Sequence, residues 1–159
     1  METGVEIRAV SQQYLAAVRE HTTSRNLATT IRELLDENAV YRFLNDAGIK
    51  EHSHNVFVFW DEQEKALLPA DPGLVIEVAV QVFAPFVGNE RVIYSSTPQG
   101  RAATLMHIGP YEQLGRTHEA IIRWCNAHHH GMTGLRWEVY GPWNDDPNKL
   151  WTEVFYLLR

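Results

Sequence analysis

The spacing of apolar residues predicts two amphipathic helices. In residues 26–46, apolar side chains return every three or four positions (Leu27, Ile31, Leu34, Tyr41 and Leu44), which is the period of a helix with one buried face. Asn38 interrupts this apolar stripe. A second helix is predicted to begin at Gly109-Pro110, because proline suits the first helical turn, and to end at Gly131. Its apolar face carries Leu114, His118, Ile121, Ile122 and Cys125.

Two strand pairs follow the helices. Residues 55–60 and 74–83 are rich in valine, isoleucine and phenylalanine, and a stretch with proline and glycine between them predicts a hairpin with a long loop. Residues 135–140 and 150–158 repeat this arrangement around the loop at 141–148. We therefore expect each helix to be followed by a β-hairpin.

The order strand, helix, strand, strand occurs twice, which indicates an internal duplication. Two extended segments, 5–18 and 92–108, precede the helices, and each is long enough to be bent. Residues 14–31 can be laid on 101–118 without a gap, at an offset of 101 − 14 = 87. Glu77 corresponds to Glu153 at the smaller offset of 153 − 77 = 76, because the second helix is shorter. Two unrelated hairpin units are the alternative. The predicted fold is α+β.

Composition and charge narrow the functional classes. The chain of 159 residues, 45% of them hydrophobic, is long enough for one packed domain. A net charge of −6 argues against direct binding of nucleic acid or of an anionic membrane. The longest apolar stretch, 73–88, is too short to span a bilayer. A single cysteine, Cys125, and an N-terminus without a secretion pattern favour a reducing cytoplasm.

Glu153 stands in an apolar and aromatic strand. Alternation places Trp151, Glu153 and Phe155 on one face, and the same argument places Glu77 opposite the aliphatic face that a helix must cover. An unpaired buried carboxylate is costly, and so is an exposed aromatic patch. We therefore expect a concave pocket suited to an organic cation or a flat, electron-poor ring. The alternative is that Glu153 pairs with an arginine such as Arg136 and that the tryptophans are ordinary packing.

Four segments of the second half occur together in a familiar order. HIGPYEQL at 107–114, WEVY at 137–140, DDP at 145–147 and WTEV at 151–154 resemble the GyrI-like small-molecule-binding domain. That domain occurs alone or as the effector-binding half of AraC-type and MerR-type transcription regulators. The first half fits only at the level of the duplicated plan.

The resemblance implies one GyrI-like domain over residues 1–159, with a first βαββ half at 1–88 and a second at 89–159. It implies a pseudo-twofold antiparallel sheet of about eight strands, two helices on one face and a central ligand cleft between the halves. In the family, the glutamate matched by Glu153 contacts cationic or polycyclic aromatic ligands. The expected ligand-binding residues are Glu153, Tyr140, Trp137, Trp151, Phe155, Tyr111 and Glu138.

Strand alternation limits this set. Trp137 and Tyr140 are an odd number of positions apart, so we expect them on opposite strand faces. Glu138 shares the face of Tyr140. Tyr111, at the start of the second helix, either lines the cleft or packs beneath it. Only one of Trp137 and Tyr140 is therefore expected to reach a ligand beside Glu153.

Three functions stay open at this point. The first is sensing or sequestration of hydrophobic, often cationic, aromatic compounds. The second is implied by family members similar to hydrolases that open strained cyclopropane rings; there Glu153 would position or deprotonate a water and Tyr140 would hold or protonate the leaving oxygen. The third is a protein-interaction module, such as a gyrase inhibitor or the partner of a separate regulator, since no helix-turn-helix segment is visible.

The histidines predict neither a metal site nor a cofactor. His128, His129 and His130 are adjacent and close to Cys125, but neighbouring side chains at a helix end point in different directions. His118 lies on the apolar helix face and is expected to be a hydrogen-bonded core histidine. The expected partner is a small ligand, with a protein partner possible and the oligomeric state not indicated.

Overall fold

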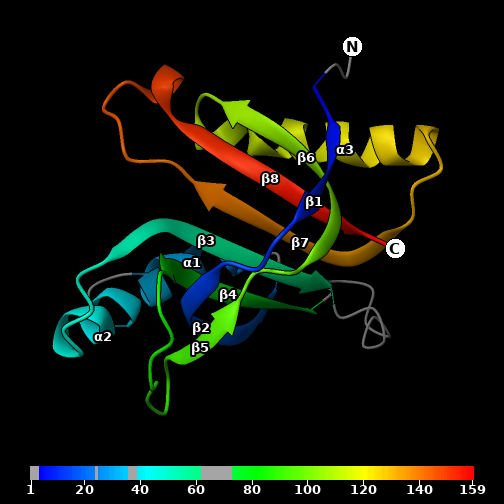
Figure 1. Cartoon of the computed structure of the whole chain (residues 1–159). Helices are drawn as coiled ribbons and strands as arrows, with labels where there is room; N and C mark the ends of the chain where they lie inside the picture. Colours follow the sequence, from blue (N-terminus) through cyan, green and yellow to red (C-terminus); the bar gives the residue numbers. More distant parts are fainter. Residues whose placement is uncertain (1–3, 24, 36–38, 62–72) are drawn as a thin grey trace. The chain divides into compact units, whose positions relative to one another are not determined.

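Eight strands and three α-helices form an antiparallel α+β fold in the described residues, which confirms the predicted fold class (Figure 1). The computed structural model describes residues 4–23, 25–35, 39–61 and 73–159. The chain divides into two compact units. The central unit comprises Gln13–Thr97, and the terminal unit comprises Met1–Gln12 together with Pro98–Arg159. None of the helices in the described residues combines the length and apolarity of a membrane span.

The central unit is a four-stranded antiparallel sheet with two helices on one face. Its strands lie in the order β3-β4-β2-β5 and its helices are α1 and α2; the bounds are β2 (Tyr14–Thr23), α1 (Leu27–Leu35), α2 (Val40–Asp46), β3 (His52–Asp61), β4 (Gly73–Val82) and β5 (Ile93–Ser96). Thr22 bonds Thr30 of α1, and Tyr41 of α2 donates to Asn55. These contacts place the helices over the aliphatic face of β4, as predicted.

The single helix predicted for residues 26–46 is wrong, because two helices, α1 and α2, occupy this range. Residues 36–38, including the predicted interruption at Asn38, lie outside the described residues. Ala39, directly before α2, has φ −130° and ψ −95°, which are not helical angles. The chain therefore changes direction here, and Val40 and Leu44 bury the apolar face of a new helix.

The terminal unit contains the other four strands, which are also antiparallel and are covered by one long helix. Its strands lie in the order β1-β6-β8-β7; the bounds are β1 (Glu6–Val10), β6 (Gly100–Ile108), α3 (Leu114–Ala127), β7 (Met132–Tyr140) and β8 (Trp151–Leu158). A 3₁₀ turn at Tyr111–Gln113 leads into α3, as the proline signal predicted. Ala103, Leu114, Ile121, Cys125, Val154, Tyr156 and Leu158 form the core between α3 and the sheet.

The two predicted extended segments are each a pair of strands that belong to different units. Segment 5–18 holds β1 and the start of β2, and segment 92–108 holds β5 and β6. The unit boundaries fall between the members of each pair, after Gln12 and after Thr97. As a result, β1 pairs with β6 and β5 pairs with β2. Each unit thus takes its edge strand from the other half of the chain.

Candidate functional site

Glu153 lies on the face of the terminal sheet that points away from α3. Tyr156 bonds His118 of α3, so Tyr156 and Thr152 mark the helix side of β8. Alternation then places Trp151, Glu153 and Phe155 on the other side. The cross-strand pairs agree, because Val139 lies opposite Glu153 and Trp137 lies opposite Phe155. The predicted parity of this strand is therefore confirmed.

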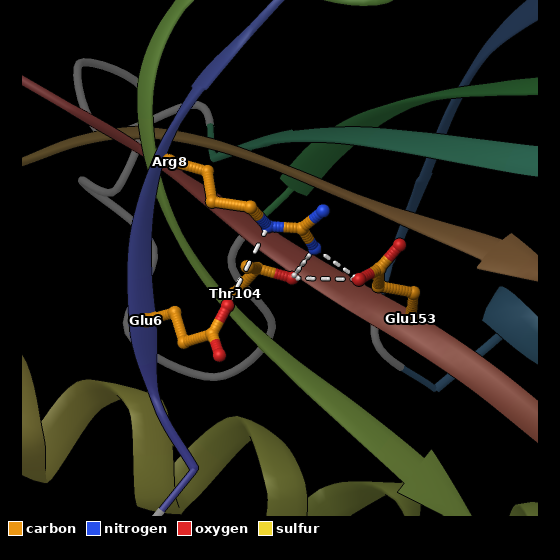
Figure 2. A network of polar contacts seen from close by, with 4 residues as sticks. All are labelled: Glu6, Arg8, Thr104 and Glu153. Atoms are coloured by element: carbon orange, nitrogen blue, oxygen red, sulfur yellow. Dashed lines mark hydrogen bonds and ion pairs between the residues drawn. The ribbon is translucent and has the colours of Figure 1, made fainter.

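The Glu153 carboxylate is paired with an arginine from the edge strand (Figure 2). Arg8 of β1 donates from Nη2 to Glu153 Oε2. Thr104 of β6 donates to the same oxygen over 3.5 Å and also lies 3.5 Å from Arg8 Nη2. Glu6 approaches the other side of the guanidinium, with its Oε2 3.9 Å from Arg8 Nε. The side chain of Glu153 is 22% exposed.

The expectation of a Glu153 carboxylate without a protein partner is wrong, and the alternative, a pair with an arginine, is what the structure shows. Arg136 was the example given for that arginine. The partner is Arg8, which lies 145 positions away in the chain. Arg136 lies opposite Tyr156 in the β7–β8 register, which is the α3 side of the sheet. Because β1 lies beside β6 at the sheet edge, the long Arg8 side chain reaches across Thr104 to Glu153.

Aromatic rings adjoin this ion pair. The guanidinium carbon of Arg8 lies 5.7 Å from the centroid of the Phe155 ring, within the range of a cation–π contact. Phe155 stacks on Trp137 with 4.9 Å between centroids and 3° between planes. Trp151 shares the face of Glu153. Three of the predicted residues, Trp137, Trp151 and Phe155, are thus brought to the Glu153 face, and their role as ligand contacts stays a prediction.

The remaining predicted residues lie on the α3 side. Tyr140 donates to Glu138 Oε1 over 2.8 Å, and the Tyr140 and Tyr111 rings meet edge to face at 5.4 Å. His118 Nε2 lies 2.7 Å from Glu138 Oε2, and its Nδ1 lies 2.7 Å from the Tyr156 hydroxyl. Tyr140 and Glu153 therefore face opposite sides of one sheet. Burial, together with the Glu138 carboxylate, raises the pKa of Tyr140, so the hydroxyl keeps its proton.

The central unit repeats the arrangement around Glu77, which is 1% exposed. Ser95 of β5 donates to Glu77 Oε1 over 2.7 Å, and Arg19 donates to the same oxygen over 3.2 Å. The guanidinium carbon of Arg19 lies 5.4 Å from the Trp60 ring centroid. In both units a strand glutamate is therefore paired with an arginine that stacks on an aromatic ring.

Sequence reasoning missed the partners of both glutamates, although a signal was present. The gap-free offset that relates residues 14–31 to 101–118 also relates Arg8 to Ser95 (95 − 8 = 87) and Arg19 to Met106 (106 − 19 = 87). The strand registers agree, since Arg19 lies opposite Glu77 and Met106 opposite Glu153. Extending the internal alignment to residue 8 would have shown that Arg8 and Ser95, the partners of the two glutamates, occupy equivalent positions in the two halves.

Other candidate groups have structural partners. Trp124 stacks on His128 at 4.3 Å and on His130 at 5.4 Å between ring centroids. Cys125 is fully buried in the core, and burial raises the pKa of its thiol. Within the described part of the chain, no group of three or more His, Cys, Asp or Glu side chains is placed to hold a metal ion.

A hollow of about 370 Å³ lies within the central unit. Residues 48–51 and 82–86 line it, with Ile49, Phe83 and Phe86 among the apolar contributors and Lys50 and Glu51 as charged ones. None of these residues belongs to the predicted site. The hollow and the predicted site are therefore different places, and a concave pocket beside Glu153 stays a prediction.

Comparisons with known proteins give a consistent result for the whole chain. The family model of the GyrI-like small molecule binding domain matches residues 3–158. The C-terminal domain of EcmrR is similar in structure, with a TM-score of 0.74 and 16% identity over 98% of this chain and 96% of that one. The structure of SAV2435 bound to tetraphenylphosphonium is similar as well, with a TM-score of 0.72 and 9% identity over 99% of this chain and 94% of that one.

A hydrolase from Listeria innocua is also similar, with a TM-score of 0.58 and 12% identity over 98% of this chain and 92% of that one. Among curated proteins, none matches the chain in sequence. At these identities, the structural similarities show a shared fold and leave the ligand of this chain to be argued from its own residues.

Proposed function

Because the chain belongs to the GyrI-like small molecule binding domain family, we propose that it binds hydrophobic organic cations on the Glu153 face. Glu153 supplies the countercharge. The partly exposed Trp151 and the buried rings of Phe155 and Trp137, which are 7% and 3% exposed, supply the aromatic wall. The observation that carries the proposal is the carboxylate of Glu153 beside the Phe155 ring, with a cationic group already lying against both. Sensing and sequestration both need only such reversible binding.

The chemistry of these groups favours a cation over a neutral compound. A cation over an aromatic face gains about 0.5–2 kcal/mol, with the larger values where water is excluded. A carboxylate adds a charge–charge attraction that grows as its surroundings become less polar, and the Glu153 side chain is only 22% exposed. SAV2435, a neighbour in structure, was solved with tetraphenylphosphonium, a phenyl-covered cation. These facts support an aromatic cation as the ligand class.

The hydrolytic alternative has less support. It requires Glu153 and Tyr140 to act on one bond, whereas the two side chains lie on opposite faces of the terminal sheet. Tyr140 is instead bonded to Glu138 beneath α3, with its hydroxyl proton held by burial. We therefore favour binding without turnover.

Titration with tetraphenylphosphonium, followed by calorimetry, tests the proposal. We expect Glu153→Gln to weaken binding about tenfold, equivalent to roughly 1.4 kcal/mol, because the countercharge is lost and Arg8 then repels the ligand. Glu119→Gln, an equal change of charge at an exposed position of α3, is the matched control and should bind like the wild type. Equal affinities of wild type and Glu153→Gln would contradict the proposal.

A further inference from the structure

Arg8 occupies the position against Glu153 that a ligand cation would need. We propose that Arg8 is an internal competitor, which the ligand must displace from Glu153 and Phe155 before it binds. This inference rests on the proposed function, since it describes how that same carboxylate becomes available. It also narrows the ligand class to cations that carry enough aromatic surface to outcompete a guanidinium.

The geometry of the pair matches that of the expected complex. The guanidinium bonds Glu153 and lies 5.7 Å from the Phe155 ring centroid (Figure 2). These are the two attractions, charge pairing and cation–π contact, that the ligand would use. One cation at a time can make both contacts, so ligand binding and the Arg8–Glu153 pair exclude each other.

Displacement of Arg8 costs little because a second carboxylate is close. Glu6 Oε2 lies 3.9 Å from Arg8 Nε, and the Glu6 side chain is 69% exposed. Glu6 and Arg8 are two positions apart on β1 and share a face of the strand. Released from Glu153, the guanidinium therefore keeps an anionic neighbour. The Arg8 side chain is itself 44% exposed, and ion pairs at such exposed sites contribute little to stability.

Glu77, the related glutamate of the central unit, cannot exchange its partners in this way. Glu77 is 1% exposed, and Ser95 lies within 3.2 Å of both of its carboxylate oxygens. Removal of its partners would leave a buried charge unpaired, which is strongly destabilising. The duplication has therefore produced one fixed carboxylate, Glu77, and one exposed enough to exchange its cation, Glu153.

Replacement of Arg8 gives the test. We expect Arg8→Gln to bind tetraphenylphosphonium about two- to fivefold more tightly than the wild type, the gain that corresponds to a partly exposed ion pair. Arg8→Lys keeps a competing cation and should stay near the wild type. Arg116→Gln, at an exposed position of α3, makes the same change of net charge and should leave the affinity unchanged. Tetraphenylborate, an anion of the same shape, should gain nothing from Arg8→Gln.

Two further variants make the result decisive. In a Glu153→Gln background, Arg8→Gln should tighten binding less than it does in the wild type, because it then removes only the repulsion by Arg8 and releases no carboxylate. Arg8→Met, which keeps an unbranched apolar side chain without the charge, replaces Arg8→Gln if the latter unfolds.

The outcomes separate the two proposals. If both uncharged Arg8 variants bind tetraphenylphosphonium as tightly as the wild type or more weakly, the competitor role is overturned. The proposed function is then unaffected. An equal gain in Arg116→Gln also overturns the competitor role, because net charge alone would explain it. Absence of tetraphenylphosphonium binding in the wild type and in both Arg8 variants overturns the proposed function, and this inference with it.

Discussion

At the residue scale, buried polar side chains on the α3 side of the terminal sheet are joined in pairs. His118 of α3 lies within 2.7 Å of both Glu138 of β7 and Tyr156 of β8. His107 of β6 lies 2.8 Å from Thr117 of α3. Since an unpaired buried polar group costs about 1–3 kcal/mol, these bonds fix the position of the helix on the sheet. His118 is hydrogen-bonded as expected, and its side chain, 19% exposed, lies at the margin of the core.

Tyr140 gives this network a dependence on pH. Burial, then the Glu138 carboxylate, raises the pKa of Tyr140 above its ordinary value of 10.0. In the unfolded chain the phenol loses its proton near that ordinary value, whereas in the folded chain it keeps the proton. The stability that Tyr140 contributes is therefore complete below pH 10 and is lost as the pH rises further. For one proton, the loss is about 1.4 kcal/mol per pH unit.

Urea unfolding between about pH 8 and 11 measures this effect. We expect Tyr140→Phe to be less stable than the wild type by about 1 kcal/mol at the lower pH, because Glu138 loses a donor. Above pH 10 the difference should shrink, since the variant has no phenol at this position to ionise. If the free energies of unfolding of the two proteins changed in parallel with pH, the raised pKa of Tyr140 would be contradicted.

At the scale of elements, the β7–β8 hairpin shows how a glycine positions an aromatic side chain. Gly141 follows β7 directly, and its amide donates to the carbonyl of Trp151 over 3.0 Å. A Cβ atom at Gly141 would collide with the indole ring of Trp151. The ring therefore packs directly on the glycine backbone, on the face that carries Glu153.

Gly141→Ala should consequently destabilise the protein by about 1–3 kcal/mol, the usual cost of overpacking, and should alter tryptophan fluorescence as Trp151 moves. Gly115→Ala in α3 is the matched control, because an added Cβ there meets nothing within 4 Å. It should stabilise the helix by up to about 1 kcal/mol. Thermal unfolding of both variants checks the prediction, and equal shifts in the two would contradict it.

Patterns within a single element were readable from the sequence, whereas pairings between distant elements were not. The alternation of β8 correctly placed Glu153 with Trp151 and Phe155, because side-chain direction in a strand is a local property. The partner of Glu153 was misidentified because Arg8 reaches it through β1–β6 pairing, which the local pattern does not encode. The α1–α2 corner was missed because both helices continue one apolar stripe. A cleft between the halves stays a prediction.

At the scale of the whole molecule, the exchange of edge strands decides which segments of the chain contain all the strands of a unit. The central unit is one continuous segment, whereas the terminal unit needs residues from both ends of the chain. A cut between the sequence halves at residue 88 would separate β5 from β2 and β1 from β6. The boundary between the duplicated halves of the sequence therefore differs from the boundaries of the two compact units.

Two fragments of similar length test this difference. Fragment 13–97 keeps the β2–β5 pairing and Ser95, which bonds Glu77. Fragment 1–88 carries β1 without its partner β6, exposes the edge of β2 and leaves Glu77 without the Ser95 hydroxyl. Since unpaired strand edges and incompletely bonded buried charges are both unfavourable, 13–97 should unfold cooperatively and at a higher urea concentration than 1–88. Circular dichroism during urea titration measures both unfolding transitions. If fragment 1–88 were as stable as fragment 13–97 or more stable, the exchanged edge strands would not be what stabilises each unit.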